Sequence, residues 1–125
     1  MTFGRTRRFL VCNQGATAVE FALVMPAFLA LVLGGLSVCV LLYSTVNLQD
    51  AVEQGARCYS VDSGTCSSAS AAQTYSQGLY YGVGAPTFTA STPACGHQVA
   101  ATVTLQIAAV LTNVSVPLTA SACFP

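Results

Sequence analysis

The sequence predicts an α+β protein, with a long N-terminal transmembrane helix that continues outward, a short helix and a small antiparallel β-meander held by disulfides. Three observations predict this fold class. An uncharged apolar run extends from Phe21 to Tyr43, the apolar period changes from helical to alternating after Pro86, and four of the six cysteines follow the run. With 125 residues, the chain has room for one small domain beside such a helix.

The composition is unusual for a soluble domain. Hydrophobic residues make up 54% of the chain and charged residues only 6%, with a formal net charge of zero. Soluble domains carry about 25% charged residues. Disorder requires low hydrophobicity, and nucleic-acid binding requires clustered Lys and Arg. We therefore expect a membrane-associated or assembled protein without a nucleic-acid partner.

The uncharged run predicts a membrane-spanning helix. As a helix it reaches roughly 35 Å at about 1.5 Å per residue, enough to cross a hydrocarbon core of about 30 Å. Arg5, Arg7 and Arg8 precede it, and the first charge after it is Asp50. The positive-inside rule then places the N-terminus in the cytoplasm and the rest of the chain outside.

A cleaved secretory signal is the alternative interpretation of this N-terminus. Such signals have an apolar core of about 7–15 residues that ends at a small-residue cleavage site. The run here is longer, and the carboxylate of Glu20 stands at its entrance. An ionisable group at that position is a functional hypothesis by default. We therefore favour a helix that is retained.

The residues around Glu20 form a specific pattern. Residues 15–26 read GATAVEFALVMP, directly after a short basic leader and directly before the long apolar stretch. This string closely resembles the processing site of type IVb (Flp) prepilins and of TadE-like pseudopilins of the tight-adherence (Tad) system. The resemblance extends from about Arg5 to Arg57, and no motif is matched in the distal half.

The resemblance implies a processing reaction. A prepilin peptidase would cut between Gly15 and Ala16, remove residues 1–15 as a leader, and leave Glu20 as the fifth residue of the mature chain, followed by Phe21. In an assembled filament, the Glu20 carboxylate would pair with the Ala16 ammonium of a neighbouring subunit and set the register between helices. The alternative is that Glu20 only snorkels to the membrane interface.

The resemblance also implies partners and a location. The partners are the prepilin peptidase, other pilins and pseudopilins through the N-terminal helix, and the inner-membrane pilus assembly platform. The location is the bacterial inner membrane in a single pass, with a cytoplasmic N-terminus and a periplasmic C-terminus, and the pilus or cell surface after assembly.

Periodicity divides the mature chain into a helix over residues 16–60, which spans the membrane at about 21–43, and a small outer α+β domain over residues 61–125. Glu53 and Arg57, four residues apart, are spaced for an ion pair on this helix. We expect the outer domain to begin with a helix capped by Ser67 or Ser68. The expected helix covers residues 67–81, and the expected strands cover 87–89, 99–107 and 114–123.

Four cysteines lie in the part of the chain expected outside the membrane, Ser44 to Pro125, and Pro117 marks the last strand as an edge strand. An even number of cysteines on the oxidising side fits two bridges, with three possible pairings. We favour Cys58–Cys66, which ties the helix end to the following turn, and Cys95–Cys123, which ties the start of the sheet to its end. The rival is a metal site with His97, but no Cys-x2-Cys pair is present.

No catalytic constellation is recognisable. His97 is the one histidine, the Ser and Thr residues lack a nearby base, and there is no Lys for a phosphate-binding loop. We expect no enzyme, cofactor or metal.

The leading hypothesis is a minor pseudopilin that is assembled into or primes a Flp-type pilus for adhesion or secretion. The alternative is a membrane-anchored binding module outside any filament; a major pilin is a third hypothesis, less favoured because Flp subunits are much shorter.

Overall fold

The computed structural model describes residues 15–108 and 112–125. Most of the expected leader, including Arg5, Arg7 and Arg8, therefore lies outside the described residues. The chain divides into two compact units, an N-terminal unit that ends at Leu36 and a C-terminal unit, Ser37–Pro125. Helix α1 contributes residues to both, and each unit is described by itself below.

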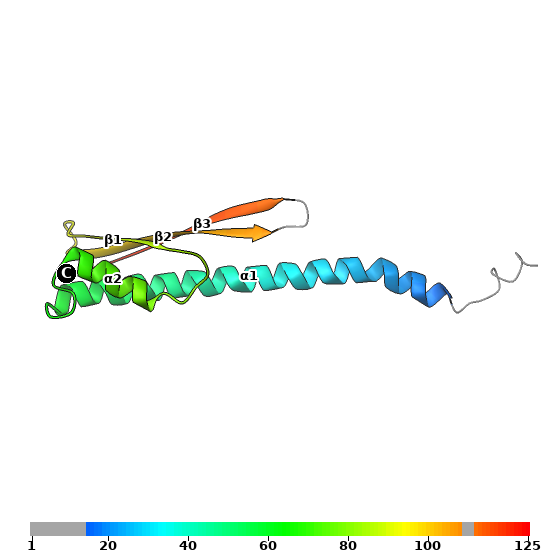
Figure 1. The fold of residues 1–125 in the computed structure, drawn as a ribbon, viewed down its shortest axis with the longest axis horizontal. Coiled ribbons are helices and arrows are strands. Elements are labelled where there is room, and N and C mark those ends of the chain that lie inside the picture. Colours follow the sequence, from blue (N-terminus) through cyan, green and yellow to red (C-terminus); the bar gives the residue numbers. More distant parts are fainter. Residues whose placement is uncertain (1–14, 109–111) are drawn as a thin grey trace, which may run out of the picture. The chain divides into compact units, whose positions relative to one another are not determined.

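The elements follow the predicted order and confirm the predicted fold class. Helix α1 covers Ala16–Val61, and helix α2 covers Ala69–Leu79. Strands β1 (Thr87–Ser91), β2 (His97–Ala108) and β3 (Asn113–Phe124) form an antiparallel sheet in the order β1-β2-β3. The three strands are labelled in Figure 1.

In the N-terminal unit, α1 has no protein cover. Every side chain described between Thr17 and Leu36 is exposed. Large apolar groups such as Phe21, Leu23 and Leu31 are 62%, 74% and 75% exposed. Among the described residues, α1 is the one helix long and apolar enough to cross a membrane. A helix that is apolar all round requires lipid or other helices around it.

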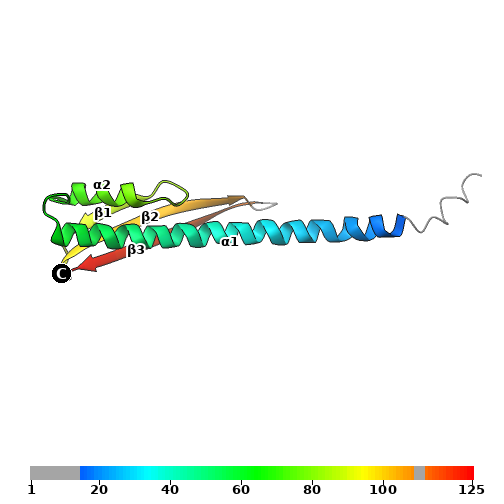
Figure 2. The same ribbon diagram turned by 90° about the horizontal axis from the view of Figure 1, so that it is seen from below.

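In the C-terminal unit, α1 and α2 lie side by side against one face of the sheet (Figures 1 and 2). Alternate residues of β2 face the helices and are buried, namely Val99, Ala101, Val103 and Leu105. The residues between them, such as Thr102 and Thr104, are exposed. This alternation is the period of two that predicted the strand.

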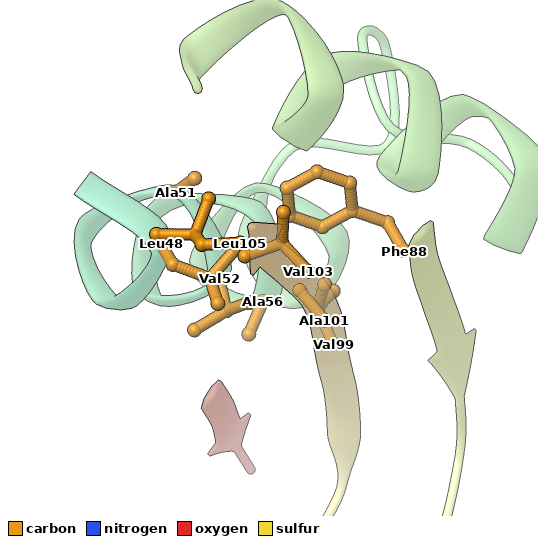
Figure 3. Close-up of a cluster of buried hydrophobic side chains, with 9 residues drawn as sticks. All are labelled: Leu48, Ala51, Val52, Ala56, Phe88, Val99, Ala101, Val103 and Leu105. Carbon is orange, nitrogen blue, oxygen red and sulfur yellow. The ribbon is translucent and has the colours of Figure 1, made fainter. Parts of the chain in front are cut away.

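One apolar cluster holds this unit together (Figure 3). Leu48 and Val52 of α1 and Val99 of β2 are its largest side chains that are at most 1% exposed. Phe88 of the neighbouring strand β1, which pairs with Ala101 of β2, belongs to the same cluster. Burying a Val or Leu side chain contributes about 1.5–3 kcal/mol, so this part of α1 is fixed to the sheet by packing.

The turn between the two helices is ordered by Asp62 and a disulfide. The Asp62 carboxylate accepts hydrogen bonds from the backbone N–H groups of Gly64, at 2.9 Å, and Thr65, at 3.1 Å. Cys58 and Cys66 are joined by a disulfide with a Cα–Cα distance of 5.7 Å. Ser68 then caps α2, since its Oγ accepts from the N–H of Ala71. Of the two caps expected from the sequence, the structure uses Ser68.

A second disulfide closes the end of the sheet. Cys95 and Cys123 are joined with a Cα–Cα distance of 6.3 Å. Both disulfides are the pairs favoured on sequence grounds. Pro117 lies in β3, at the edge of the sheet, where a residue without an N–H is tolerated.

The loop after α2 is tied to α1 by a buried serine. Ser44 Oγ accepts a hydrogen bond from the N–H of Val83, at 3.2 Å, and the hydroxyl of Tyr80 donates to the Val83 carbonyl, at 2.7 Å. Burial raises the pKa of Tyr80, and a hydrogen bond with Ser44 opposes that rise. Ser44 is therefore a buried polar contact between segments far apart in the sequence.

One side-chain prediction is wrong. The spacing of Glu53 and Arg57 predicted an ion pair, but the Glu53 carboxylate accepts a hydrogen bond from the side chain of Gln49, at 3.3 Å. Within residues 15–108 and 112–125, no salt bridge joins Glu53 to Arg57. Both residues are exposed, and an exposed pair of this kind stabilises a helix by only about 0.3–0.5 kcal/mol.

Candidate processing and assembly site

The predicted processing site lies at the start of α1. Gly15 immediately precedes the first helical residue, Ala16. Gly15 is exposed, and a Cβ placed on it would meet no atom within 4 Å. The backbone at Gly15 is therefore open to an enzyme, as close approach by an active site requires.

Glu20 follows one turn later on the same helix. Its side chain and that of Phe21 are exposed, and both precede an apolar stretch without a further charge up to Tyr43. Within the described residues the one arginine is Arg57, which belongs to the C-terminal unit. Among the groups the structure describes, Glu20 forms no salt bridge, so it is available to a charge from outside the chain.

The helix beyond Glu20 contains three residues that affect packing. Pro26 lies inside α1, where it removes one backbone hydrogen bond. A Cβ on Gly34 or Gly35 would meet no atom within 4 Å. Small residues let membrane helices approach each other closely, so this patch is open to a neighbouring helix.

The structure also describes the residues of the rival metal hypothesis. The sulfur atoms of Cys95 and Cys123 form a disulfide and are not available as thiolate ligands. The His97 ring packs edge-on against Tyr59 of α1, with ring centroids 4.4 Å apart. In this arrangement His97 contributes to the packing between the end of α1 and the start of β2.

A shallow depression lies at the end of α1 in the C-terminal unit. It contains Arg57 and Asp62, which carry opposite charges, and the phenol ring of Tyr75. Hydrogen bonds from the side chain and backbone of Thr65 and the backbone of Gly64 lower the pKa of Asp62, so this carboxylate stays ionised. The residues around the depression are Gln54, Arg57, Cys58, Val61, Asp62 and Tyr75.

Sequence reasoning did not identify the residues that dock α1 to the rest of the C-terminal unit. Gly55 and Ser44 are buried on the face of α1 that meets α2 and the loop after it. The signal for them is a line of small residues at helical spacing, Ser44, Ala51, Gly55 and Cys58, which Leu48 interrupts. That line was visible, but its partners are far away in the sequence.

The segment that contains the candidate site is similar to a known protein family. The model of the TadE-like protein family matches residues 15–57. No curated protein and no solved structure matches the chain. The matched segment contains the exposed apolar part of α1, which begins after Gly15, and the part that packs on the sheet, including Val52 and Ala56.

The match lies within the region of the resemblance, about Arg5 to Arg57; it leaves out the leader before Gly15 and ends, like the resemblance, at Arg57. The second helix, the sheet and the disulfide Cys95–Cys123 lie outside it. Residues 15–57 are thus similar to the TadE-like family, which is consistent with a TadE-like protein of the Tad system.

Proposed function

We propose that the chain is a minor pseudopilin of a Flp-type pilus, cleaved between Gly15 and Ala16 by a prepilin peptidase. The mature chain is assembled into the pilus, or primes it, for adhesion or secretion. The observation that carries this proposal is the position of the TadE-like match, which begins at the glycine directly before α1. The bare apolar surface from Thr17 to Leu36 supports it.

The exposed surface of α1 explains how one helix serves two states. Before assembly, lipid surrounds the apolar side chains, and a helix of this length and composition is suited to span the bilayer. In a filament, the helices of other pilins replace the lipid. Lipid and helices are equally apolar, so this exchange depends on close packing and polar contacts, not on the hydrophobic effect.

Glu20 is the charged group of α1 that most needs a partner in the filament. Cleavage after Gly15 creates a new ammonium group on Ala16. A carboxylate among packed apolar helices requires a paired charge, and the ammonium of a neighbouring subunit supplies it. Glu20 forms no salt bridge within the described residues, so its carboxylate is free for that pair.

The C-terminal unit has a structural role in this proposal and no enzymatic one. It is a compact unit with its own core and two disulfides, and the C-terminal part of α1 belongs to it. These properties equally suit a binding module that is anchored in the inner membrane and never enters a filament. Processing distinguishes the two roles, because a pseudopilin loses residues 1–15 and an anchored module has no need to.

N-terminal sequencing and intact mass of the membrane-extracted chain test the proposal. We expect the mature chain to begin at Ala16. The Gly15→Asp variant should keep its leader, because a charged side chain crowds the scissile bond, and it should still fold because nothing lies within 4 Å. The matched control is Gly78→Asp, at an exposed glycine of α2 that is equally open.

The two variants give opposite expectations. Gly78→Asp should be cleaved like the parent, whereas Gly15→Asp should not. A parent chain that retains Met1, or that begins near Ser37, contradicts processing at Gly15. Equal cleavage of both variants contradicts the assignment of Gly15 as the residue that the peptidase recognises.

A further inference from the structure

The depression at the end of α1 is lined by two opposite charges that do not pair with each other. Arg57 and Asp62 both lie in its wall, yet within residues 15–108 and 112–125 no salt bridge joins them. The guanidinium group of Arg57 has five N–H donors and no acceptor, so it binds anions. A cation and an anion that share one wall without contact leave space between them for a ligand.

The carboxylate of Asp62 is fixed in position. Its Oδ1 atom accepts hydrogen bonds from the backbone N–H groups of Gly64 and Thr65. The disulfide Cys58–Cys66 closes the same turn. A carboxylate offers about four lone-pair sites, so these bonds hold the group in place and leave it able to attract a cation.

The ring of Tyr75 is fixed by the packing of α2 on α1. Tyr75 is half-buried and directly precedes Ser76, which is buried against α1. A Cβ on Gly55 of α1 would lie 3.1 Å from the Cβ of Ser76. The face of an aromatic ring attracts a cation within about 6 Å of its centre. Tyr75 and Asp62 therefore form a side of the depression that suits a cation, whereas Arg57 forms a side that suits an anion.

The size and the wall of the depression suit a small polar ligand. Its volume is about 410 Å³, within the range of about 300–1,000 Å³ for small-molecule sites. Val61, which is 79% exposed, is the one aliphatic side chain in its wall. The charges of Arg57 and Asp62 cancel, so a ligand with a single charge is attracted by one residue and repelled by the other. A ligand that carries both charges is attracted by both.

We propose that this depression binds a small zwitterion, a molecule in which a short linker joins an ammonium group to a phosphate or carboxylate group. The anionic group binds the guanidinium of Arg57, whose planar fork matches phosphate and carboxylate oxygens. The ammonium group lies against Asp62 and the ring of Tyr75. Lipid headgroups and free solutes share this chemistry. The inference does not depend on the proposed pilus function, because all three residues belong to the C-terminal unit.

Titration of the full chain in an uncharged maltoside detergent tests the inference. Glycerophosphocholine, which has the charged groups of a lipid headgroup, and glycine betaine, a free solute with a carboxylate, are the two zwitterions. Choline and inorganic phosphate each supply one half of the ligand. Chemical shifts of the backbone amides of Arg57, Gly64 and Tyr75 report binding. The amide of Thr104, on the exposed face of the sheet, is the internal reference.

We expect a zwitterion to shift the three amides saturably and to leave Thr104 unchanged. Choline and phosphate should each bind at least about tenfold more weakly, because each makes only one of the two charge contacts. A response to glycerophosphocholine without glycine betaine assigns a lipid headgroup, and the reverse assigns a free carboxylate solute. Responses to both show that the pair of charges is recognised with either anion.

Arg57 is exposed, so variants at this position should fold. Arg57→Gln should weaken zwitterion binding at least about tenfold. Arg57→Lys should weaken it less, because lysine keeps the charge but lacks the planar fork. Glu53→Gln is the control, since Glu53 is a charged residue of the same helix outside the wall, and its binding should equal that of the parent.

Three results overturn the inference. The first is the absence of saturable shifts with both zwitterions. The second is phosphate binding as tight as that of either zwitterion, which would reduce the depression to an anion site. The third is unchanged zwitterion binding by Arg57→Gln, which would place the ligand elsewhere on the chain.

Discussion

Gly55 of α1 lies directly against Ser76 of α2. A Cβ placed on Gly55 would come within 3.1 Å of the Cβ of Ser76, and closer still to its Oγ. Both residues are buried, and the Ser76 hydroxyl donates to the Ala72 carbonyl of its own helix at 2.8 Å. The absence of a side chain at Gly55 therefore sets how closely the two helices approach.

We expect Gly55→Ala to destabilise the C-terminal unit by about 1–3 kcal/mol, the usual cost of overpacking. This loss should appear although alanine improves helix propensity by up to about 1 kcal/mol. Gly78→Ala is the matched control, because Gly78 is a helical glycine of the same unit with nothing within 4 Å. Urea unfolding of the detergent-solubilised chain, followed by tyrosine circular dichroism, measures both changes.

A second substitution tests the cause. Ser76→Ala removes the Oγ atom that the new methyl group would meet, so it should restore part of the stability lost in Gly55→Ala. If Gly55→Ala is as stable as Gly78→Ala, the two helices have room to separate and the close contact does not limit their packing.

The two disulfides close loops of different length. Their sequence separations are 8 for Cys58–Cys66 and 28 for Cys95–Cys123. In the chain-entropy model, the shorter loop contributes about 2.5 kcal/mol and the longer about 3.6 kcal/mol. Replacing both cysteines of the longer loop with serine should therefore lower the free energy of unfolding more than the same replacement in the shorter loop.

Urea unfolding of the two double variants tests this order. Non-reducing peptide mapping of each variant would establish that the remaining pair is still bonded. A larger loss from Cys58/Cys66 would contradict the entropic ranking and would mean that the turn after α1 matters more than the closure of the sheet.

Asp62 makes the turn between the helices sensitive to acid. Hydrogen bonds from the side chain and backbone of Thr65 and the backbone of Gly64 hold the pKa of Asp62 below its ordinary value of 3.8. Because the pKa is lower in the folded turn, the ionised carboxylate stabilises this turn at pH values above the ordinary pKa of 3.8. That contribution is lost as the pH falls through the lowered pKa.

Hydrogen exchange at the amides of Gly64 and Thr65 measures this contribution. Protection should decrease as the pH falls below about 4, and in Asp62→Asn this decrease should be absent because the amide does not titrate. Asp50→Asn serves as the control, since Asp50 accepts only a side-chain hydrogen bond from Gln54 on the helix surface. Equal pH profiles for the parent and Asp62→Asn would exclude the carboxylate as the cause.

The fold was largely predictable because local patterns determine it. An uncharged run, a period of two in β2 and the cap at Ser68 each identify an element without knowledge of the rest. The disulfides were predictable because the cysteines lie at the ends of predicted elements. Cys58 and Cys66 flank the turn after α1, and Cys95 and Cys123 lie at the start and the end of the sheet. Pro117 likewise indicated an edge strand, because proline has no backbone N–H to donate to a neighbouring strand.

Contacts between distant segments were not predictable. The approach of Gly55 to Ser76 and the hydrogen bond from Val83 to Ser44 depend on how α2 lies on α1, which no periodicity encodes. The preference of Glu53 for Gln49 over Arg57 depends on rotamers of exposed side chains, whose alternatives differ by a few tenths of a kcal/mol. Gly15 and Glu20 could be proposed as a site from the sequence, because both belong to a short contiguous motif, and their roles stay predictions.

The last prediction separates assembly from anchoring and concerns Glu20. In the proposed filament, Glu20→Gln leaves the Ala16 ammonium of the neighbour without its counter-charge among packed helices. Removing one partner of a buried pair costs about 3–5 kcal/mol, so incorporation into pili should fall steeply. Cleavage, membrane insertion and both disulfides should persist, because neither the Gly15 site nor the C-terminal unit is changed.

The matched control is Glu53→Gln, a carboxylate on the exposed surface of the same helix whose one hydrogen bond comes from Gln49. Pilus content and subunit co-purification, measured in strains with verified cleavage, should drop for Glu20→Gln and stay at the parental level for Glu53→Gln. If Glu20 only snorkels to the interface, incorporation of Glu20→Gln should stay at the parental level. The reason is that an amide keeps the size of the side chain and enters the membrane more easily than a carboxylate. Normal incorporation of Glu20→Gln would therefore remove the register role of this residue and favour a binding module anchored by α1.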